Sequence, residues 1–214
     1  ERPVSRARSL GAYVEELFAV EDRALAAIRK ASRRAKLPDI AISAEEGKVL
    51  LVLLRAIGAR RVLEIGTLGG YSGVWIARAL APGGTLTTIE GNPEFARIAR
   101  ASFARAGVAD RVQLLEGRAL EILPRLDPGY DAVFVDADKE PLEQYYHASL
   151  RLLRPGGLLL CDNALISGRV IDRSDRAADV KGVRAFNRLA ATDGRVIATI
   201  LAVRDGLLVG VKSD

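Results

Sequence analysis

The sequence predicts an α/β fold in which helices cover both faces of a doubly wound, mostly parallel sheet. Two observations lead to this prediction. From Arg61 onward, short apolar runs alternate with amphipathic segments, which gives the repeating order of strand and helix. The apolar runs are rich in leucine and β-branched residues and lack polar alternation, as is typical of strands that are buried on both faces. The pattern therefore favours a Rossmann-like arrangement.

The elements follow in order along the chain. Extra helices come first, at 12–35 and 43–57. The first has apolar residues at helical spacing and ends before Pro38. The second begins at Ser43 with Glu46 three residues later, the pattern of a capping box. Five strands and four helices then alternate: we expect strands at 61–66, 85–90, 111–116, 131–136 and 157–162, and helices at 71–80, 93–106, 118–125 and 140–153.

The C-terminal part of the chain is expected to complete the sheet. A helix at 177–191 leads to two further apolar runs, at 196–203 and 206–212. Because only two residues separate these runs and a glycine follows, we expect them to pair as an antiparallel hairpin.

Composition limits the classes of protein that the chain can represent. Its 214 residues suit one domain, spanning 1–214, with an N-terminal helical segment (1–42) and an α/β core (43–214). The net charge of +5 is spread without a run of five like charges, so we expect no nucleic-acid partner. The lone Cys161 indicates a reducing compartment, and we expect a cytoplasmic protein. No stretch of about 18 uncharged apolar residues occurs, so we expect no membrane partner.

A glycine-rich segment, EIGTLGGYS at 64–72, joins the first strand to the next helix. Its glycines let the backbone approach a ligand, and the amides at the start of the helix are hydrogen-bond donors. The segment is not a dinucleotide fingerprint, because Leu68 stands where that motif needs glycine, and it is not a P-loop. The motif therefore indicates another ligand, or a tight turn without one.

Two acidic residues flank this loop. Glu90 ends the second strand, where a carboxylate can accept hydrogen bonds from both hydroxyls of a ribose. Glu64 stands two residues before the first glycine and could accept from the ammonium of an amino acid. S-adenosylmethionine carries both groups. The alternative is that both acids are ordinary surface residues.

Further oxygen-bearing side chains end the next two strands. Asp136 follows the fourth strand, and Asp162 and Asn163 follow the fifth. The carboxyl ends of neighbouring strands meet at one crevice, so these three side chains are expected to converge. Such ligands suit Mg²⁺, with Ca²⁺ or Mn²⁺ as alternatives, and do not suit zinc. Each acid taken alone could instead be a helix cap.

Four segments, VLEIGTLGGYS, TIEGNPE, VFVDADK and GLLLCDN, resemble in order and spacing the metal-dependent class I O-methyltransferases. This family includes catechol and caffeoyl-CoA O-methyltransferases and their bacterial relatives. The resemblance covers about residues 36–212, and VDADK together with the Asp-Asn pair is specific to this branch. It implies a seven-stranded sheet with one reversed strand in the C-terminal hairpin.

The resemblance also implies an activity and a set of site residues. Lys139 is the expected general base, and Asp136, Asp162 and Asn163 are the expected ligands of a divalent cation. The expected S-adenosylmethionine site comprises Ile42, Glu64, Gly66, Thr67, Gly70, Ser72, Glu90, Gly117, Ala119 and Asp136. The substrate would be a small phenolic molecule with adjacent hydroxyls, and relatives are usually homodimers. For Lys139 the alternative is a structural ion pair with Asp138 or Glu143.

Several positions depart from the family pattern and leave the acceptor open. Ile166 stands where relatives often carry Trp, Thr199 where catechol methyltransferases place a Glu, and Arg118 where an acid is usual. Three alternatives compete with the expected function: a nucleic-acid methyltransferase, an aminopropyl transferase and a non-catalytic donor-binding protein. The N-terminal helix is either a lid over the acceptor or a dimerisation arm.

Overall fold

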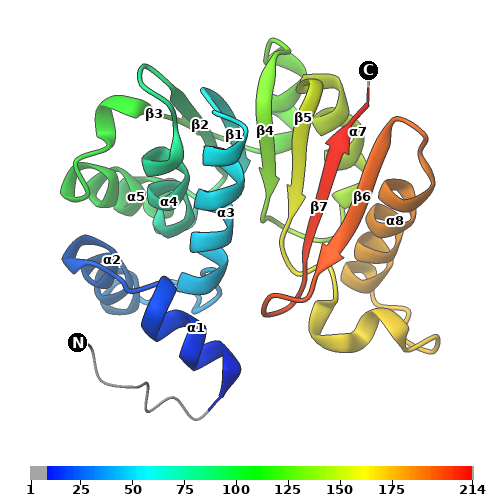
Figure 1. The fold of residues 1–214 in the computed structure, drawn as a ribbon, viewed down its shortest axis with the longest axis horizontal. Helices are drawn as coiled ribbons and strands as arrows, with labels where there is room; N and C mark the ends of the chain where they lie inside the picture. The colour runs from blue at the N-terminus through cyan, green and yellow to red at the C-terminus, as the bar shows by residue number, and fades with distance from the viewer. Residues whose placement is uncertain (1–8, 214) are drawn as a thin grey trace.

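The structure is a computed structural model that describes residues 9–213. Its centre is a seven-stranded sheet in the order β3-β2-β1-β4-β5-β7-β6, with helices on both faces (Figure 1). The strands are β1 (Arg61–Ile65), β2 (Thr85–Glu90), β3 (Val112–Glu116), β4 (Tyr130–Val135), β5 (Leu153–Cys161), β6 (Val196–Leu201) and β7 (Leu207–Lys212). β1 to β5 pair in parallel and β7 is antiparallel to both of its neighbours, so the predicted fold class is confirmed.

The helices form two layers, one on each face of the sheet. They are α1 (Leu10–Phe18), α2 (Arg23–Arg34), α3 (Ala44–Ala56), α4 (Tyr71–Ala79), α5 (Pro93–Arg105), α6 (Ala119–Ile122), α7 (Leu142–Leu152) and α8 (Ala178–Thr192), with short 3₁₀ helices at Ala109–Arg111, Leu123–Arg125 and Ile166–Ile171. Successive strand residues point to opposite faces. Val62 thus joins the core beneath α3 and α4, and Leu63 joins the core beneath α7 and α8. Both faces of the central strands are buried, as their continuous apolar runs predicted.

The single helix predicted over 12–35 is wrong. The chain forms α1 and α2, separated at 19–22. Asp22 has extended backbone angles, and its carboxylate accepts a hydrogen bond of 2.9 Å from the Leu25 amide. This N-cap starts a new helix and interrupts the helical backbone before it.

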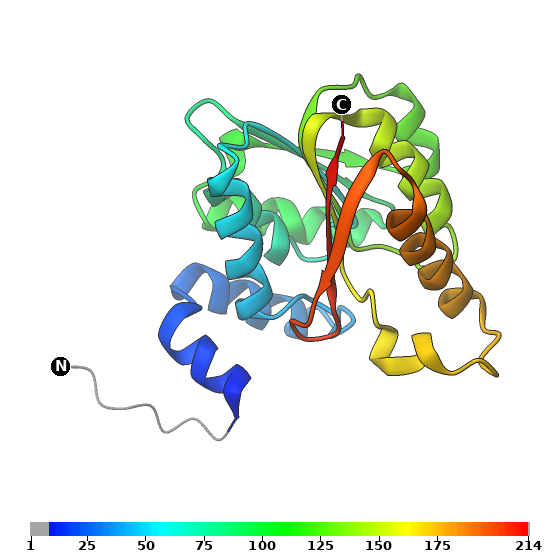
Figure 2. The ribbon, with the colours of Figure 1, turned by 45° about the vertical axis from the view of Figure 1, so that its right-hand side comes forward.

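The C-terminal hairpin is antiparallel, as predicted, but the expected two-residue turn is wrong. Residues 202–206 connect β6 to β7. Arg204 and Gly206 both have positive φ, of 49° and 83°, and the Gly206 amide donates to the Val203 carbonyl. The connection projects beside the segment that joins α2 to α3 (Figure 2).

Strand register brings the ends of the parallel strands to one edge. Ile65 pairs with Val135, and Val135 pairs with Cys161. The ladder continues for one residue beyond the strands, because the Asp136 amide donates to Ile65 and the Asp162 amide donates to Val135. The residues that follow β1, β4 and β5 therefore face a common space. Within residues 9–213, no helix has the length and apolar character needed to cross a membrane.

Candidate active site

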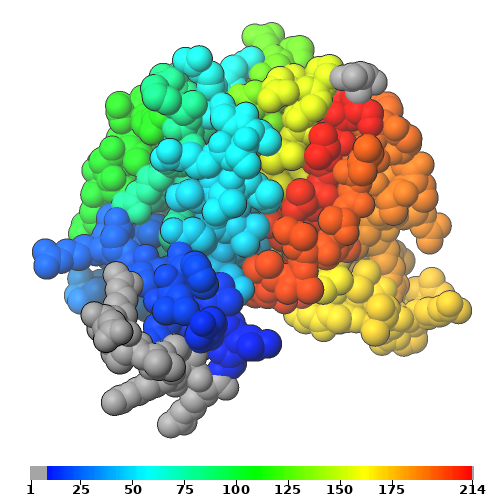
Figure 3. Space-filling view, in the orientation of Figure 1, coloured from blue at the N-terminus to red at the C-terminus, as the bar shows by residue number. Residues whose placement is uncertain are grey.

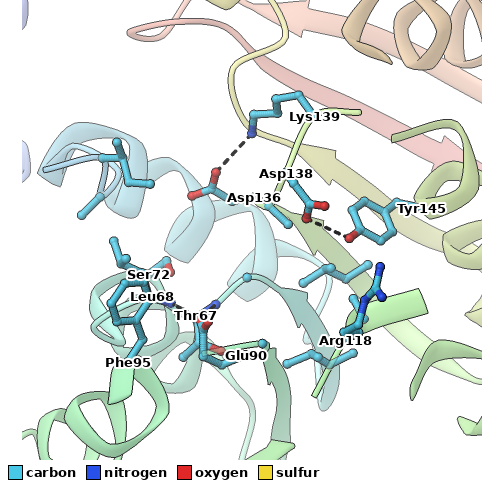
Figure 4. A pocket seen from close by; sticks show the side chains of 18 of the residues that line it. Thr67, Leu68, Ser72, Glu90, Phe95, Arg118, Asp136, Asp138, Lys139 and Tyr145 are labelled. Atoms are coloured by element: carbon cyan, nitrogen blue, oxygen red, sulfur yellow. Dashed lines mark hydrogen bonds and ion pairs between the residues drawn. The ribbon is translucent and has the colours of Figure 1, made fainter. Parts of the chain in front are cut away.

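A cavity of about 600 Å³ opens at this edge of the sheet, between the glycine-rich segment and the segment that precedes α3 (Figure 4). Most of the predicted site residues line it: Ile42, Gly66, Thr67, Ser72, Glu90, Gly117, Ala119, Asp136, Lys139 and Asn163. Glu64, Gly70 and Asp162 are also predicted site residues, but they are buried behind the lining. The structure thus brings the predicted residues of six separate segments to one place.

Gly66 allows the glycine-rich loop to lie against the backbone of Asp136. Its φ is +97°, and a Cβ atom at this position would be 2.0 Å from the Asp136 carbonyl oxygen. No side chain fits there. Gly70, with φ +82°, caps α4 without any side-chain hydrogen bond. The loop therefore lies closely against the end of β4, and the amides of Gly66, Thr67, Leu68 and Gly70 donate within the protein rather than into the cavity.

Glu90 holds the glycine-rich loop in place. One of its carboxylate oxygens accepts from the Leu68 amide (2.7 Å) and the Thr67 amide (3.3 Å), and the other accepts from the Asn92 amide (2.8 Å). A carboxylate offers about four acceptor positions. Glu90 therefore retains capacity for about one further hydrogen bond, whereas the predicted role is to accept from both hydroxyls of a ribose.

Glu64 is fully buried at the end of β1. Its Oε2 accepts a hydrogen bond of 2.6 Å from Thr88, whereas its Oε1 is buried without a hydrogen-bond partner. Burial raises its pKa to about 8, although the hydroxyls of Ser72 and Thr88 oppose the rise. An unpartnered buried acceptor beside the cavity fits a cationic ligand such as an ammonium group.

The three predicted metal ligands lie at the ends of β4 and β5. Asp162 is 1% exposed; its Oδ1 accepts from the Asn163 amide at 2.5 Å, and its Oδ2 is buried without a partner. Burial raises the pKa of Asp136 to about 6, and the nearby charge of Lys139 opposes the rise. An orphaned buried carboxylate oxygen beside a second carboxylate and an amide fits a hard divalent cation.

No group of three or more His, Cys, Asp or Glu side chains among residues 9–213 has an arrangement that could hold a metal ion. The predicted ligand set is different in kind, because it has two carboxylates, Asp136 and Asp162, and the side-chain amide of Asn163. Cys161 is a buried thiol on the adjacent strand position, and burial raises its pKa to about 12.

Lys139 projects into the cavity toward Asp136, with 3.4 Å between Nζ and Oδ1 (Figure 4). Burial opposes the charge on Lys139, but the carboxylates of Asp136 and Asp162 raise its pKa overall. Lys139 thus forms its ion pair with Asp136 and not with Asp138 or Glu143, the two partners considered from the sequence. Asp138 accepts a hydrogen bond of 3.0 Å from the Tyr145 hydroxyl. In the protein alone, Lys139 is an ammonium group rather than a base.

Glu46 is a site residue that the sequence did not reveal. The Ser43 hydroxyl accepts from its amide at 3.0 Å, so the predicted helix start is confirmed, but the Glu46 carboxylate points inward. It is fully buried, and neither of its oxygens has a hydrogen-bond partner. Burial and then the neighbouring Asp162 raise its pKa to about 9. The capping-box pattern concealed this placement.

Other lining residues were also missed or only partly foreseen. Ile40, Phe95 and Tyr145 line the cavity, and no sequence motif distinguished them. Arg118 reaches the same cavity with an exposed side chain. Ile166 and Thr199, the other two departures from the family pattern, are not among its lining residues.

Comparison with known proteins identifies relatives of the whole chain. Residues 15–213 match the family model described as O-methyltransferase. The chain is 45% identical over 184 residues to a catechol O-methyltransferase of Mycobacterium tuberculosis, covering 86% of this chain and 84% of the relative. It is 40% identical over 208 residues to a catechol O-methyltransferase of Niastella koreensis, covering 95% and 92%.

Solved structures agree with these relatives. An O-methyltransferase from Bacillus cereus in complex with SAH superposes with a TM-score of 0.90 at 37% identity, covering 95% of this chain and 97% of that one. The O-methyltransferase TomG from Streptomyces achromogenes, involved in tomaymycin synthesis and solved with SAM, superposes with a TM-score of 0.90 at 42% identity, covering 96% of each chain.

Proposed function

The chain belongs to the O-methyltransferase family, and we propose that it transfers the methyl group of S-adenosylmethionine to a hydroxyl of a catechol-like small molecule with the help of a divalent cation. One observation carries the proposal. Lys139 and Asp136 meet Asn163 in the same cavity that the glycine-rich loop and Glu90 line. A donor site and an acceptor site would thus share one wall.

The donor half of the proposal depends on the acids around the glycine-rich loop. Glu90 has acceptor capacity for a ribose, and the buried Glu64 offers an oxygen without a partner to an ammonium group. Relatives solved with SAH and with SAM support this assignment. Ile42 lies over the cavity from the opposite side and would cover the bound donor.

The acceptor half depends on oxygen ligands. Asp136, Asp162 and Asn163 would hold the cation, which would bind two adjacent hydroxyls and stabilise a phenolate at neutral pH. A free phenol has a pKa of about 10 and is a poor nucleophile without such help. The acceptor oxygen then forms its bond to the methyl carbon while the carbon–sulfur bond breaks, and the sulfur keeps the electron pair. Orientation dominates a transfer of this kind.

Lys139 would receive the proton of the acceptor hydroxyl. It can do so only after losing its own proton, and Asp136 and Asp162 hold its pKa up in the protein alone. Positive charge placed beside these carboxylates would cancel their influence and lower the pKa of Lys139. We therefore expect Lys139 to become a base only in the fully loaded site.

Metal removal tests this proposal. We expect EDTA, Asp136→Ala and Asp162→Ala each to abolish methylation of caffeic acid, while S-adenosylmethionine binding measured by calorimetry survives at least in part. Asp127→Ala, which changes an exposed acid away from the cavity, is the matched control. Full activity in EDTA would refute the role of the metal, and a parent protein that does not bind the donor would refute the whole proposal.

We also propose that the protein acts as a homodimer through α1. This helix exposes Leu10, Tyr13 and Phe18 at 87%, 46% and 62%, which is an apolar face of a kind that a second subunit could cover. Light scattering of the parent and of Phe18→Glu tests this proposal. A monomeric parent would refute it.

A further inference from the structure

The wall of the cavity that faces the glycine-rich loop is an irregular segment between α2 and α3. Ile40, Ala41 and Ile42 from this segment line the cavity. Two arginines from distant parts of the chain hold its backbone. Arg29 of α2 donates to the Ile42 carbonyl at 2.9 Å, and Arg204 of the β6–β7 connection donates to the Ala41 carbonyl at 2.8 Å. Two consecutive carbonyls are thus bound by guanidinium groups from two separate elements.

A second cavity, of about 820 Å³, lies on the other side of the same segment. It is lined by α1, by residues 19–21 between α1 and α2, by Arg29 and Arg204, and by residues 39 and 41–44. Ala41 and Ile42 therefore line both cavities. The space-filling view shows the N-terminal helices beneath α3, next to the end of the hairpin (Figure 3). The side chain of Ile42 is buried, but the backbone of residues 41–42 lies between the two cavities.

Arg29 also connects this segment to the glycine-rich loop. Its Nε donates to Glu21 at 2.5 Å, and the Tyr71 hydroxyl donates to the same Glu21 oxygen at 2.5 Å. The Arg29 guanidinium lies 3.8 Å from the centre of the Tyr71 ring, a cation–π contact. Tyr71 begins α4 directly after the loop and lines the first cavity. Both sides of the cavity are therefore joined through one guanidinium group.

We propose that Arg29 and Arg204 are positioning residues that clamp residues 40–42 over the bound methyl donor and thereby set the rate at which it leaves. The inference rests on the donor site of the proposed function. Neither arginine lines the donor cavity, and each donates to a backbone carbonyl of the segment that does. Hydrogen bonds from a charged donor are stronger than neutral ones, which suits them to fixing a segment that packing leaves free on two sides.

The test compares donor binding by Arg29→Ala and Arg204→Ala with that of the parent. Arg34→Ala, an exposed arginine on the same helix α2, is the matched control. Trp75 in α4 is the only tryptophan of the chain, so its fluorescence in stopped-flow mixing can report S-adenosylmethionine binding and release. We expect about tenfold weaker binding in each alanine variant, equivalent to about 1.4 kcal/mol, through faster dissociation. Hydrogen exchange at the amides of residues 40–42 should also accelerate.

Lysine variants separate positioning from a general loss of stability. Arg29→Lys and Arg204→Lys keep a charged donor, and we expect them to recover part of the affinity that alanine loses. If Arg29→Ala does not fold, Arg204→Ala and Arg29→Lys decide the matter. Donor affinity and dissociation rates within twofold of the parent in the folded variants would overturn the clamp. A parent that fails to bind the donor would instead refute the proposed function.

Discussion

Gly182 in α8 lies against Lys139, although the two residues are 43 positions apart in the sequence. The helix packs so closely on the Lys139 backbone that a Cβ atom at position 182 would lie 1.8 Å from the Lys139 carbonyl oxygen and 3.2 Å from that of Glu140. Ordinary contacts of a Cβ atom begin at 3.4 Å. Gly182→Ala must therefore push α8 and the Lys139 backbone apart by about 1.6 Å, the difference between these distances.

The size of this shift predicts a large loss of activity. A misplacement of about 1 Å can reduce the rate of an oriented reaction about 100-fold, so we expect kcat of Gly182→Ala to fall by at least about 100-fold. Overpacking costs about 1–3 kcal/mol of unfolding free energy. Alanine is better than glycine in a helix by about 1 kcal/mol, which offsets part of this cost. The variant should therefore fold, with a modestly reduced melting temperature.

Methyl transfer at saturating donor and acceptor is the assay, together with donor binding and thermal unfolding. Gly194→Ala is the matched control, because a Cβ atom there would meet nothing within 4 Å and its φ is not in the positive range. Donor affinity should change little, because the proposed donor site lies mainly on the glycine-rich loop and Glu90. A folded Gly182→Ala protein with kcat within threefold of the parent would refute the reasoning.

Three further predictions concern buried groups. Burial raises the pKa of Glu64 to about 8, so the unfolded chain releases this proton at lower pH than the folded protein does. The free energy of unfolding should therefore fall as pH rises from about 5 to 8. In chemical unfolding series, Glu64→Gln should remove this loss, and it should also weaken donor binding. Burial and Asp162 raise the pKa of Glu46 to about 9, so this group also lowers the free energy of unfolding as pH rises. Glu46→Gln should therefore raise the melting temperature of the metal-free protein at pH 8. An unchanged melting temperature would contradict this. Gly47→Ala would place a Cβ atom 2.4 Å from the Trp75 ring. It should lower the unfolding free energy by about 1–3 kcal/mol, measured in urea titrations followed by tryptophan fluorescence. An unaltered unfolding free energy would show that the ring can move aside.

The sheet and much of the cavity could be predicted because their signals are local. An uninterrupted apolar run such as AVFV or LLLC is typical of a strand that is buried on both faces, and the end of each run predicts where its strand ends. Glu90, Asp136 and Asp162 each stand at such an end, and parallel pairing brings their backbones into line. The position of each acid at the end of a predicted strand was therefore enough to predict that the three acids lie at one edge of the sheet.

Features that depend on tertiary contacts could not be predicted in this way. Asp22 interrupts the first helix because it caps α2 and also pairs with Arg78 of α4 at 2.7 Å, a contact that no helical pattern reveals. Glu46 has the spacing of a capping residue and yet points into the core. Gly182 resembles any small helical residue until the helix is placed against Lys139.

The buried acids explain why the cavity suits cationic ligands in a chain whose net charge is +5. Glu64 and Asp162 each retain one buried oxygen without a hydrogen-bond partner, and burying an unpaired acceptor costs stability. A ligand that supplies positive charge would recover it, and by linkage the recovered free energy would appear both as binding affinity and as increased stability. The residues that destabilise the free protein are thus the ones expected to select its ligands.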